Sequence, residues 1–390
     1  MTSPRRRALP RRGQTLGRPP SLLGRFVRAT DWLVIGGTLG ILALAMFNLN
    51  SAGAGDWSGK IVSQARWLGL GAIAAAIVGG LGYQFLYRTA YVAYAAGVGL
   101  LALVPVIGLV RNDARRWIGI GDYQFQPSEL MKVVLVLALA RYLHDRPHND
   151  ARPGPGRRLA RLLDALVPVA IIAAPVAFII VQPDLSTSIL CILIGTCVLA
   201  TTRLSLRSLL ALGSAGLAAF ALGWGFFMRS YQRSRIDVWL NPEAYADDEG
   251  YQTIQAMISV GNGGFFGRGI GQGTQNKLGF LPYGETDFPF AVFAEEWGFA
   301  GCALVIAMFL CVILWALNLA SRAQDRFAAL LAVGVAAMFF WHVVINTGMV
   351  LQLLPVTGIT LPFFSIGGSS ALTMLIGVGV LLAVSRPPRE

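Results

Sequence analysis

The chain has 390 residues, of which 55% are hydrophobic and 13% are charged, and its formal net charge is +12. A soluble domain carries nearly twice this share of charged residues, so the composition excludes an ordinary soluble globular protein. Nucleic-acid binding is excluded as well, because the strongly basic residues 1–30 are too short and too rich in proline, arginine and glycine to form a folded basic domain.

Uncharged stretches of about 20 residues, the length that crosses a membrane, recur along the chain. The run Phe327–Ser385 is long enough for two spans, separated by a break at 353–368. Ser128–His144 carries three charged residues. We count it as a span because basic and acidic connections alternate along the chain only if it crosses the membrane. The predicted fold is an all-α integral membrane protein with ten transmembrane helices in one domain, residues 31–386. The other spans are expected at Trp32–Gly55, Trp67–Tyr87, Thr89–Val110, Ala165–Pro183, Leu185–Thr202, Ser208–Met228 and Trp297–Ser321.

Arginines gather at every second connection between these spans, and the remaining connections hold most of the acidic residues. The positive-inside rule makes the arginine-rich connections cytoplasmic. Ten spans place both termini on that side, with residues 1–30 as a basic, disordered cytoplasmic tail that anionic lipid attracts. The one long connection on the outer side, residues 229–287, is an extracytoplasmic loop between the seventh and eighth helices.

The long loop is expected to have structure of its own, because structureless loops of this length are uncommon in compact proteins. Its first part is typical of short amphipathic helices, broken at Asn241–Pro242. Nine glycines follow between residues 261 and 284, a density that suits tight turns and close approach of the backbone to a ligand. We expect Gly269 and Gly271 to contact the substrate.

Two other outer connections, residues 111–132 and 182–187, also place polar side chains against the membrane. Glu129 and Lys132 are three residues apart on one helix face and can form an ion pair. Ionisable groups within a span usually face the bundle interior and mark a functional path; the alternative is an ion pair that only locks helix packing. The predicted substrate-binding residues are Arg115, Arg116, Gln126, Ser128, Glu129, Lys132, Asp184, Gly269 and Gly271.

A cavity built from these residue types suits an amphiphile with a lipid tail, a diphosphate and a sugar. Arginine binds phosphate oxygens through paired hydrogen bonds. Carboxylates either activate a hydroxyl or hold a divalent cation such as Mg²⁺ or Mn²⁺. The spacing assigns no set of metal ligands, and the four cysteines lie within spans without zinc-binding spacing.

Four carboxylates stand near the start of the eighth span: Glu285, Asp287, Glu295 and Glu296. Asp287 either acts on a lipid-linked substrate at the membrane surface or caps the helix, with Pro289 in the first turn. Glu295 and Glu296 point about 100 degrees apart on a helix, so they cannot share one role. We expect them to pair with an arginine or a helix terminus, and we expect Glu285 at the solvated rim.

Seven motifs, in this order, resemble the SEDS family of peptidoglycan polymerases: ARRWI at 114–118, QPSELMK at 126–132, QPDLST at 182–187, YQRSRI at 231–236, GTQNKLGFLP at 273–282, ETDFPFAVFAEEWG at 285–298 and LPFFSIGGSS at 361–370. The resemblance covers nearly the whole chain after about residue 30. GTQ at 273–275 and NTGMV at 346–350 favour RodA, the elongation polymerase, over FtsW, the division polymerase. The chain departs from the family pattern at Ser186 and Ile366, and it has LPYGETDF where RodA chains often have LPE-x-HTDF.

The resemblance implies that the protein polymerises lipid II on the outer face of the bacterial plasma membrane during cell elongation and rod-shape maintenance. The 4-hydroxyl of the acceptor's GlcNAc attacks the anomeric carbon of the donor's MurNAc, undecaprenyl diphosphate leaves, and the configuration inverts. The family's essential aspartate corresponds to Asp287, the predicted catalytic base. A class B penicillin-binding protein, which is a single-span transpeptidase, and the elongation machinery are the implied partners.

Two other functions fit a polar bundle of this kind. One is a transporter or flippase of lipid-linked precursors, and the other is a non-catalytic scaffold for a wall synthase. The ionisable groups gather at the outer side, with no matching relay toward the cytoplasmic half, which disfavours the transporter.

Overall fold

The computed structural model describes residues 32–52, 59–111, 114–120, 123–146, 157–201 and 230–386. The predicted tail, residues 1–30, and the predicted span Ser208–Met228 lie outside these ranges. Within the described ranges the chain is mostly helical, as predicted.

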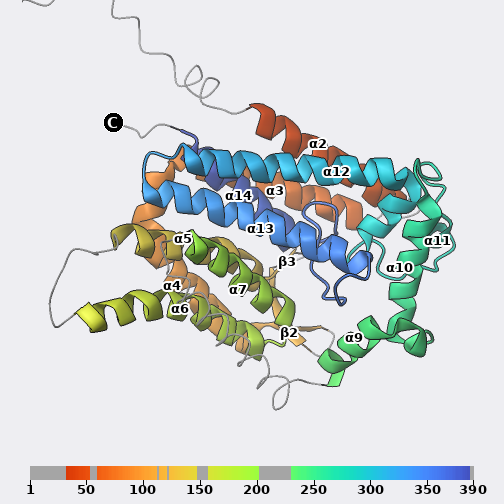
Figure 1. Cartoon of the computed structure of the whole chain (residues 1–390), viewed down its shortest axis with the longest axis horizontal. Helices are drawn as coiled ribbons and strands as arrows, with labels where there is room; N and C mark the ends of the chain where they lie inside the picture. Colours follow the sequence, from red (N-terminus) through yellow and green to blue (C-terminus); the bar gives the residue numbers. More distant parts are fainter. Residues whose placement is uncertain are drawn as a thin grey trace, which may run out of the picture.

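Long helices pack side by side into a bundle (Figure 1). Shorter elements stand at one end of this bundle, and they are α9 (Ser230–Leu240), η1 (Pro242–Tyr245), α10 (Glu249–Gly263) and α11 (Thr274–Lys277). The predicted helical structure of the long loop, with a break at Asn241, is thus confirmed. The long helices are α2 (Trp32–Ala52), α3 (Gly59–Leu81), α4 (Tyr83–Ile107), α5 (Pro127–Asp145), α6 (Arg157–Val181), α7 (Leu185–Ala200), α12 (Pro289–Ser321), α13 (Arg326–Val350) and α14 (Gly368–Val384).

Five of these helices, α2, α3, α4, α12 and α13, are long and apolar enough to cross a membrane. Helices α6, α7 and α14 contain shorter apolar stretches, and the break predicted at 353–368 falls between α13 and α14. The chain is therefore a multi-pass helical membrane protein. The count of ten spans stays a prediction.

Helix α5 confirms the charged helix predicted at Ser128–His144. It contacts α4, α6, α7, α13 and α14, and every residue from Met131 to Ala140 is buried. Protein rather than lipid therefore surrounds Glu129 and Lys132, which are both buried, and this is where membrane proteins tolerate charged side chains.

The boundary between α3 and α4 differs from the prediction. One predicted span ended at Tyr87 and the next began at Thr89, with Arg88 in the connection. Helix α4 instead begins at Tyr83 and includes Arg88, because Gly82 supplies the positive φ of 81° that turns the chain there. An arginine near a helix end can extend its charge toward the interface, so it marks no break.

The all-α prediction is wrong between α4 and α5, where three described strands form an antiparallel sheet in the order β1-β2-β3. Its strands are β1 (Leu109–Arg111), β2 (Ala114–Ile120) and β3 (Tyr123–Phe125). In β2, ARRWIGI contains the aromatic and β-branched residues that strands favour, and its side chains alternate between two faces. The arginines in this segment concealed that pattern.

Helix α12 is broken at Gly298, which has a φ of 65° and a ψ of −166°. The break frees backbone N–H groups that the membrane cannot satisfy. The carbonyls of Gly264 and Phe265 accept them, from Phe299 at 2.9 Å and Ala300 at 3.0 Å. The glycine-rich loop is therefore joined to the break in this helix.

The described ends of the chain lie at the same end of the bundle. Asn276 in α11 donates to the carbonyl of Ala52, so α2 runs toward the end that carries α11. Ser369, at the start of α14, contacts Gln126 at the start of α5, and α14 runs away from the same end (Figure 1). This arrangement agrees with an even number of crossings; which side is cytoplasmic stays a prediction.

Candidate active site

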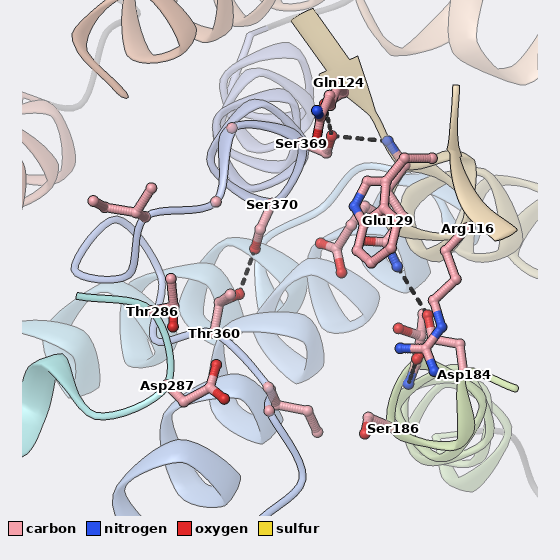
Figure 2. A pocket seen from close by; sticks show the side chains of 18 of the residues that line it. Arg116, Gln124, Glu129, Asp184, Ser186, Thr286, Asp287, Thr360, Ser369 and Ser370 are labelled. Carbon is pink, nitrogen blue, oxygen red and sulfur yellow. Dashed lines mark hydrogen bonds between the residues drawn. The ribbon is translucent and has the colours of Figure 1, made fainter. Parts of the chain in front are cut away.

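Polar residues from separate parts of the sequence line one cavity of about 680 Å³, a volume within the usual range for small-molecule sites. Its walls come from α3, the sheet, the starts of α5, α7 and α14, helix α9, the turn before α12 and the loop after α13. Five of the site residues predicted from the sequence line it, namely Arg116, Gln126, Glu129, Asp184 and Asp287. Figure 2 shows most of them around the same space.

Asp287 reaches the cavity from the turn before α12, across from Asp184 and Arg116 (Figure 2). The N-cap of α12 is Phe288, without a side-chain hydrogen bond, so the helix-cap interpretation of Asp287 is wrong. Burial raises the pKa of Asp287, while the positive charge of Arg235 and a hydrogen bond from Thr286 act in the opposite direction.

A side chain of α13 fixes the backbone at Asp287 through a hydrogen bond. The buried side chain of Asn346 on α13 donates to the carbonyls of Ile359 at 2.7 Å and Asp287 at 3.2 Å. Arg235 on α9 also lines the cavity, and it donates to the carbonyl of Val356 at 3.0 Å. Arg235 was not among the site residues predicted from the sequence, although it belongs to the YQRSRI motif.

Polar contacts connect α5, α13 and the start of α14 beside the cavity. The predicted ion pair is confirmed, with Lys132 Nζ 2.8 Å from Glu129 Oε2. Lys132 is fully buried and lies equally close, at 2.8 Å, to Nε2 of His342. The Nδ1 atom of His342 is 2.9 Å from the carbonyl of Thr360, so Nδ1 donates there and Nε2 accepts from the lysine. Thr360 then contacts Ser370 at 2.7 Å (Figure 2).

His342, which lies within a span where a histidine commonly serves helix packing, also lines the cavity. Lys132 is not among the lining residues in the described chain, so it contacts the cavity only through Glu129 and His342. The signal for His342 in the sequence is its position in an uncharged span, ahead of Thr360 and of the LPFFSIGGSS motif that directly follows Thr360.

Asp184 is the hydrogen-bond acceptor at the start of α7. Its Oδ1 accepts from the backbone of Thr187, which makes Asp184 the N-cap of this helix. Its Oδ2 accepts from Gln126 at 2.8 Å and from Ser128 at 3.4 Å. Gln126 and Ser128 therefore connect α5 to α7, and Ser128 does so from a fully buried position.

The two arginines of the ARRWI motif take different positions. Arg116 lines the cavity and donates to the carbonyls of Gln182, at 3.1 Å, and Pro183. Arg115 is exposed and donates to the carbonyl of Pro105 at 3.0 Å. Successive side chains of a strand point to opposite faces, so only one of the two predicted cations reaches the site.

The departures from the family pattern are structurally accommodated. Ser186 lines the cavity and donates to the carbonyl of Thr357 at 2.5 Å, connecting α7 to the loop after α13. Ile366 lines it too, and its N–H donates to the carbonyl of Glu285 at 2.8 Å. Glu285 itself forms an ion pair with the exposed Lys60 at 2.8 Å.

Gly269 and Gly271 do not line the cavity that the described residues form. The loop that contains them approaches α12 instead: the N–H groups of Arg268 and Gly269 donate to the carbonyls of Glu295 and Glu296, both at 3.0 Å. A Cβ on Gly267 would collide with the carbonyl of Glu296. Glycine is thus required here for packing against a helix rather than for the expected contact with a ligand.

Glu295 and Glu296 take separate roles, as their spacing predicted. Glu295 is fully buried and accepts hydrogen bonds from the backbone of Thr274, at 2.9 Å, and Gln275 at the start of α11. The predicted pairing with a helix terminus is therefore confirmed for Glu295. Glu296 accepts a hydrogen bond from Ser51 on α2.

Among the described residues no group of three His, Cys, Asp or Glu side chains gathers to hold a metal ion. Two carboxylates that line the cavity already have partners, since Asp184 caps α7 and Glu129 pairs with Lys132. The residues present do not form a resident site for the Mg²⁺ or Mn²⁺ considered from the sequence.

Comparison with known proteins agrees with this geometry. The chain is 40% identical over 295 residues to Stage V sporulation protein E of Bacillus subtilis, covering 74% of this chain and 76% of that protein. It is 37% identical over 286 residues to the peptidoglycan glycosyltransferase MrdB of Escherichia coli K12, covering 73% and 74%.

Two solved structures share the fold. One, described as showing structural coordination of polymerization and crosslinking by a peptidoglycan synthase complex, has a TM-score of 0.78 at 33% identity and covers 91% of this chain and 97% of that one. The rod shape determining protein RodA of Thermus thermophilus has a TM-score of 0.68 at 32% identity, covering 91% and 96%. The family model for FtsW, RodA and SpoVE, described as cell cycle proteins, matches residues 27–390. The chain therefore belongs to the FtsW/RodA/SpoVE family, which is the SEDS family.

Proposed function

We propose that this protein is a peptidoglycan glycosyltransferase that polymerises lipid II into glycan strands with inversion at the anomeric carbon. Its family and the names of its curated relatives support the glycosyltransferase class. The observation that carries the reaction is the carboxylate of Asp287, which lines a polar cavity with arginines and caps no helix.

In this proposal Asp287 is the general base. It accepts the proton of the acceptor's 4-hydroxyl as that oxygen forms a bond to the anomeric carbon of the donor sugar. The bond from that carbon to the diphosphate oxygen breaks, and undecaprenyl diphosphate leaves. A raised pKa favours this role, because a general base is most effective when its pKa lies near the working pH.

Arg116 and Arg235 are the cations we assign to the diphosphate. Both line the cavity, on walls formed by β2 and α9. An arginine has five N–H donors, and the backbone contacts of Arg116 hold its guanidinium in place while other donors face the cavity. Arg116 contacts the backbone at Gln182, just after α6 and two residues before Asp184. The hydrogen bonds from Gln126 and Ser128 to Asp184 fix this segment against α5 and so help to position Arg116.

The cavity lies at the end of the bundle that carries the long loop, which the positive-inside rule places outside the plasma membrane. We therefore propose an active site on the extracytoplasmic side of the bacterial inner membrane, in one domain over residues 31–386, with the long loop at 229–287. The deeper part of α5, from Val133 to Ala140, is buried and uncharged. It offers no polar route toward the other side along this helix, which disfavours a flippase.

The GTQ and NTGMV motifs and the similarity to a RodA structure support a role in elongation. A neighbour that is part of a peptidoglycan synthase complex supports a class B penicillin-binding protein as partner.

The test is glycan polymerisation by the purified protein with lipid II, compared with Asp287→Asn. We expect glycan product from wild type and at least a hundredfold less from the variant, as is typical for a lost general base. Lipid movement in vesicles without product would indicate a flippase. Neither activity, with retained binding of a transpeptidase, would indicate a scaffold.

A further inference from the structure

Tyr283 has an unusual backbone conformation beside the site. Its φ is 57°, in the left-handed region that favours glycine, and it is one of four non-glycine residues with positive φ in the described chain. Its carbonyl accepts hydrogen bonds from the N–H groups of Thr286, Asp287 and Phe288, at 3.1, 3.0 and 3.1 Å. Tyr283 therefore organises the turn that presents Asp287.

A glycine would adopt this conformation without strain, and Gly284 is the next residue. Backbone strain of this kind is retained where the surrounding structure or function requires it. The carbonyl contacts explain the turn but not the side chain, because any residue has a carbonyl. Tyr283 as a whole residue is 65% exposed, and it lines the cavity.

Other aromatic rings line the same cavity but are less available. Trp67 is only 8% exposed and packs against Gly368, and Trp117 in β2 is partly buried. Tyr283 thus presents an exposed ring face within four residues of Asp287, in a cavity otherwise rich in hydroxyl, amide and charged groups.

A pyranose ring has a face of C–H groups and an edge of hydroxyls. The C–H face packs on an aromatic ring, whose negative face attracts it, while the hydroxyls bond to polar groups such as Thr286. We infer that the ring of Tyr283 is the stacking platform for the acceptor sugar, holding it so that its hydroxyl meets Asp287. This inference rests on the proposed function.

The first experiment measures polymerisation rate against lipid II concentration for Tyr283→Gly, Tyr283→Leu and Tyr283→Phe. Tyr283→Gly relieves the backbone strain, so loss of its activity cannot be attributed to unfolding if its melting temperature is at least that of wild type. We expect the KM for lipid II to rise about three- to tenfold in the glycine and leucine variants, the contribution typical of a stacked ring. Tyr283→Phe keeps the ring and should stay within about twofold. Phe280→Ala removes an exposed ring outside the cavity lining and is the control.

The second experiment separates sugar recognition from general damage. Undecaprenyl diphosphate carries the lipid and the diphosphate but no sugar, so its inhibition constant should stay within about twofold in every Tyr283 variant. Equal weakening of lipid II and undecaprenyl diphosphate, or unchanged KM values for Tyr283→Gly and Tyr283→Leu, would overturn the inference. If wild type makes no glycan, the proposed function fails, and direct binding of lipid II to the same variants still decides the role of Tyr283.

Discussion

Removing Lys132 should damage both the fold and the reaction, and the structure allows the two effects to be separated. In Lys132→Met, Glu129 keeps its charge but loses the ammonium group at 2.8 Å, and its side chain is only 10% exposed. Breaking a buried pair by removing one partner typically costs about 3–5 kcal/mol, because an uncompensated buried charge remains. That is a large part of the roughly 5–15 kcal/mol that stabilises a typical protein.

The double variant Glu129→Gln/Lys132→Met removes the orphaned charge. We expect thermal denaturation in detergent to show that more than half of the lost stability returns, whereas polymerisation stays at least tenfold below wild type. The reason is that His342 has lost the donor to its Nε2 atom and the cavity has lost the Glu129 carboxylate. Lys60→Met is the matched control, because it breaks an ion pair of the same 2.8 Å length whose lysine is 66% exposed. Exposed pairs contribute about 0–1 kcal/mol.

Two results would refute this reasoning. A folded Lys132→Met protein with the wild-type polymerisation rate would show that the lysine only locks helix packing, the alternative that the sequence left open. A double variant as unstable as the single one would show that the orphaned charge is not the source of the instability.

The remaining predictions concern the turn and the glycine-rich loop. Polymerisation should fall as pH drops through the raised pKa of Asp287, and Arg235→Gln, which removes an opposing charge, should move that fall to higher pH in a rate–pH profile. Because a raised carboxyl pKa means that stability is lost as pH rises through it, Asp287→Asn should melt at a higher temperature than wild type at neutral pH. Gly267→Ala should destabilise by about 2–4 kcal/mol, since its Cβ meets the Glu296 carbonyl at a φ of 79°. Gly271→Ala, with a φ of 68° and open space, should cost only about 1 kcal/mol by the same denaturation measurement.

The helical bundle could be predicted because a membrane span has a length and composition that follow from the bilayer itself. The same reasoning identified α5 from its place in the alternation of connections, despite its charged residues, and located the break between α13 and α14. It failed at residues 109–125, where the strands are 3 to 7 residues long. Such short strands give too few alternating positions to stand out beside a run of arginines.

The glycine-rich loop shows a limit of a different kind. The sequence indicated close approach of the backbone to some other group, and the structure has that approach at Gly263 and Gly267. The partner is the helix α12, which begins at Pro289 and is broken at Gly298, whereas the predicted span began only at Trp297. Glycine density predicts proximity but does not identify the neighbour.

For the candidate site, the sequence identified those residues whose charge is costly near a membrane: Arg116, Glu129, Asp184 and Asp287. It missed His342 and Arg235 because neither is unusual where it stands. A histidine in a span commonly serves helix packing, and an arginine in an exposed loop needs no explanation. Their roles depend on tertiary contacts with Lys132 and with the turn of Asp287.

The charged groups of the site are of two kinds: Glu129 and Lys132 form a buried ion pair, and Asp287 has no such partner among the described residues. Glu129 and Lys132 form an ion pair where burial makes an isolated charge costly, so the pair can fix the cavity wall. Among the described residues no lysine or arginine forms an ion pair with the carboxylate of Asp287, and burial raises the pKa of Asp287. Protonation relieves the cost of burying an unpaired carboxylate, whereas protonation of a paired carboxylate would break its ion pair. Of the three carboxylates that line the cavity, Glu129 pairs with Lys132 and Asp184 caps α7, so Asp287 is the one that the proposed reaction uses as its base.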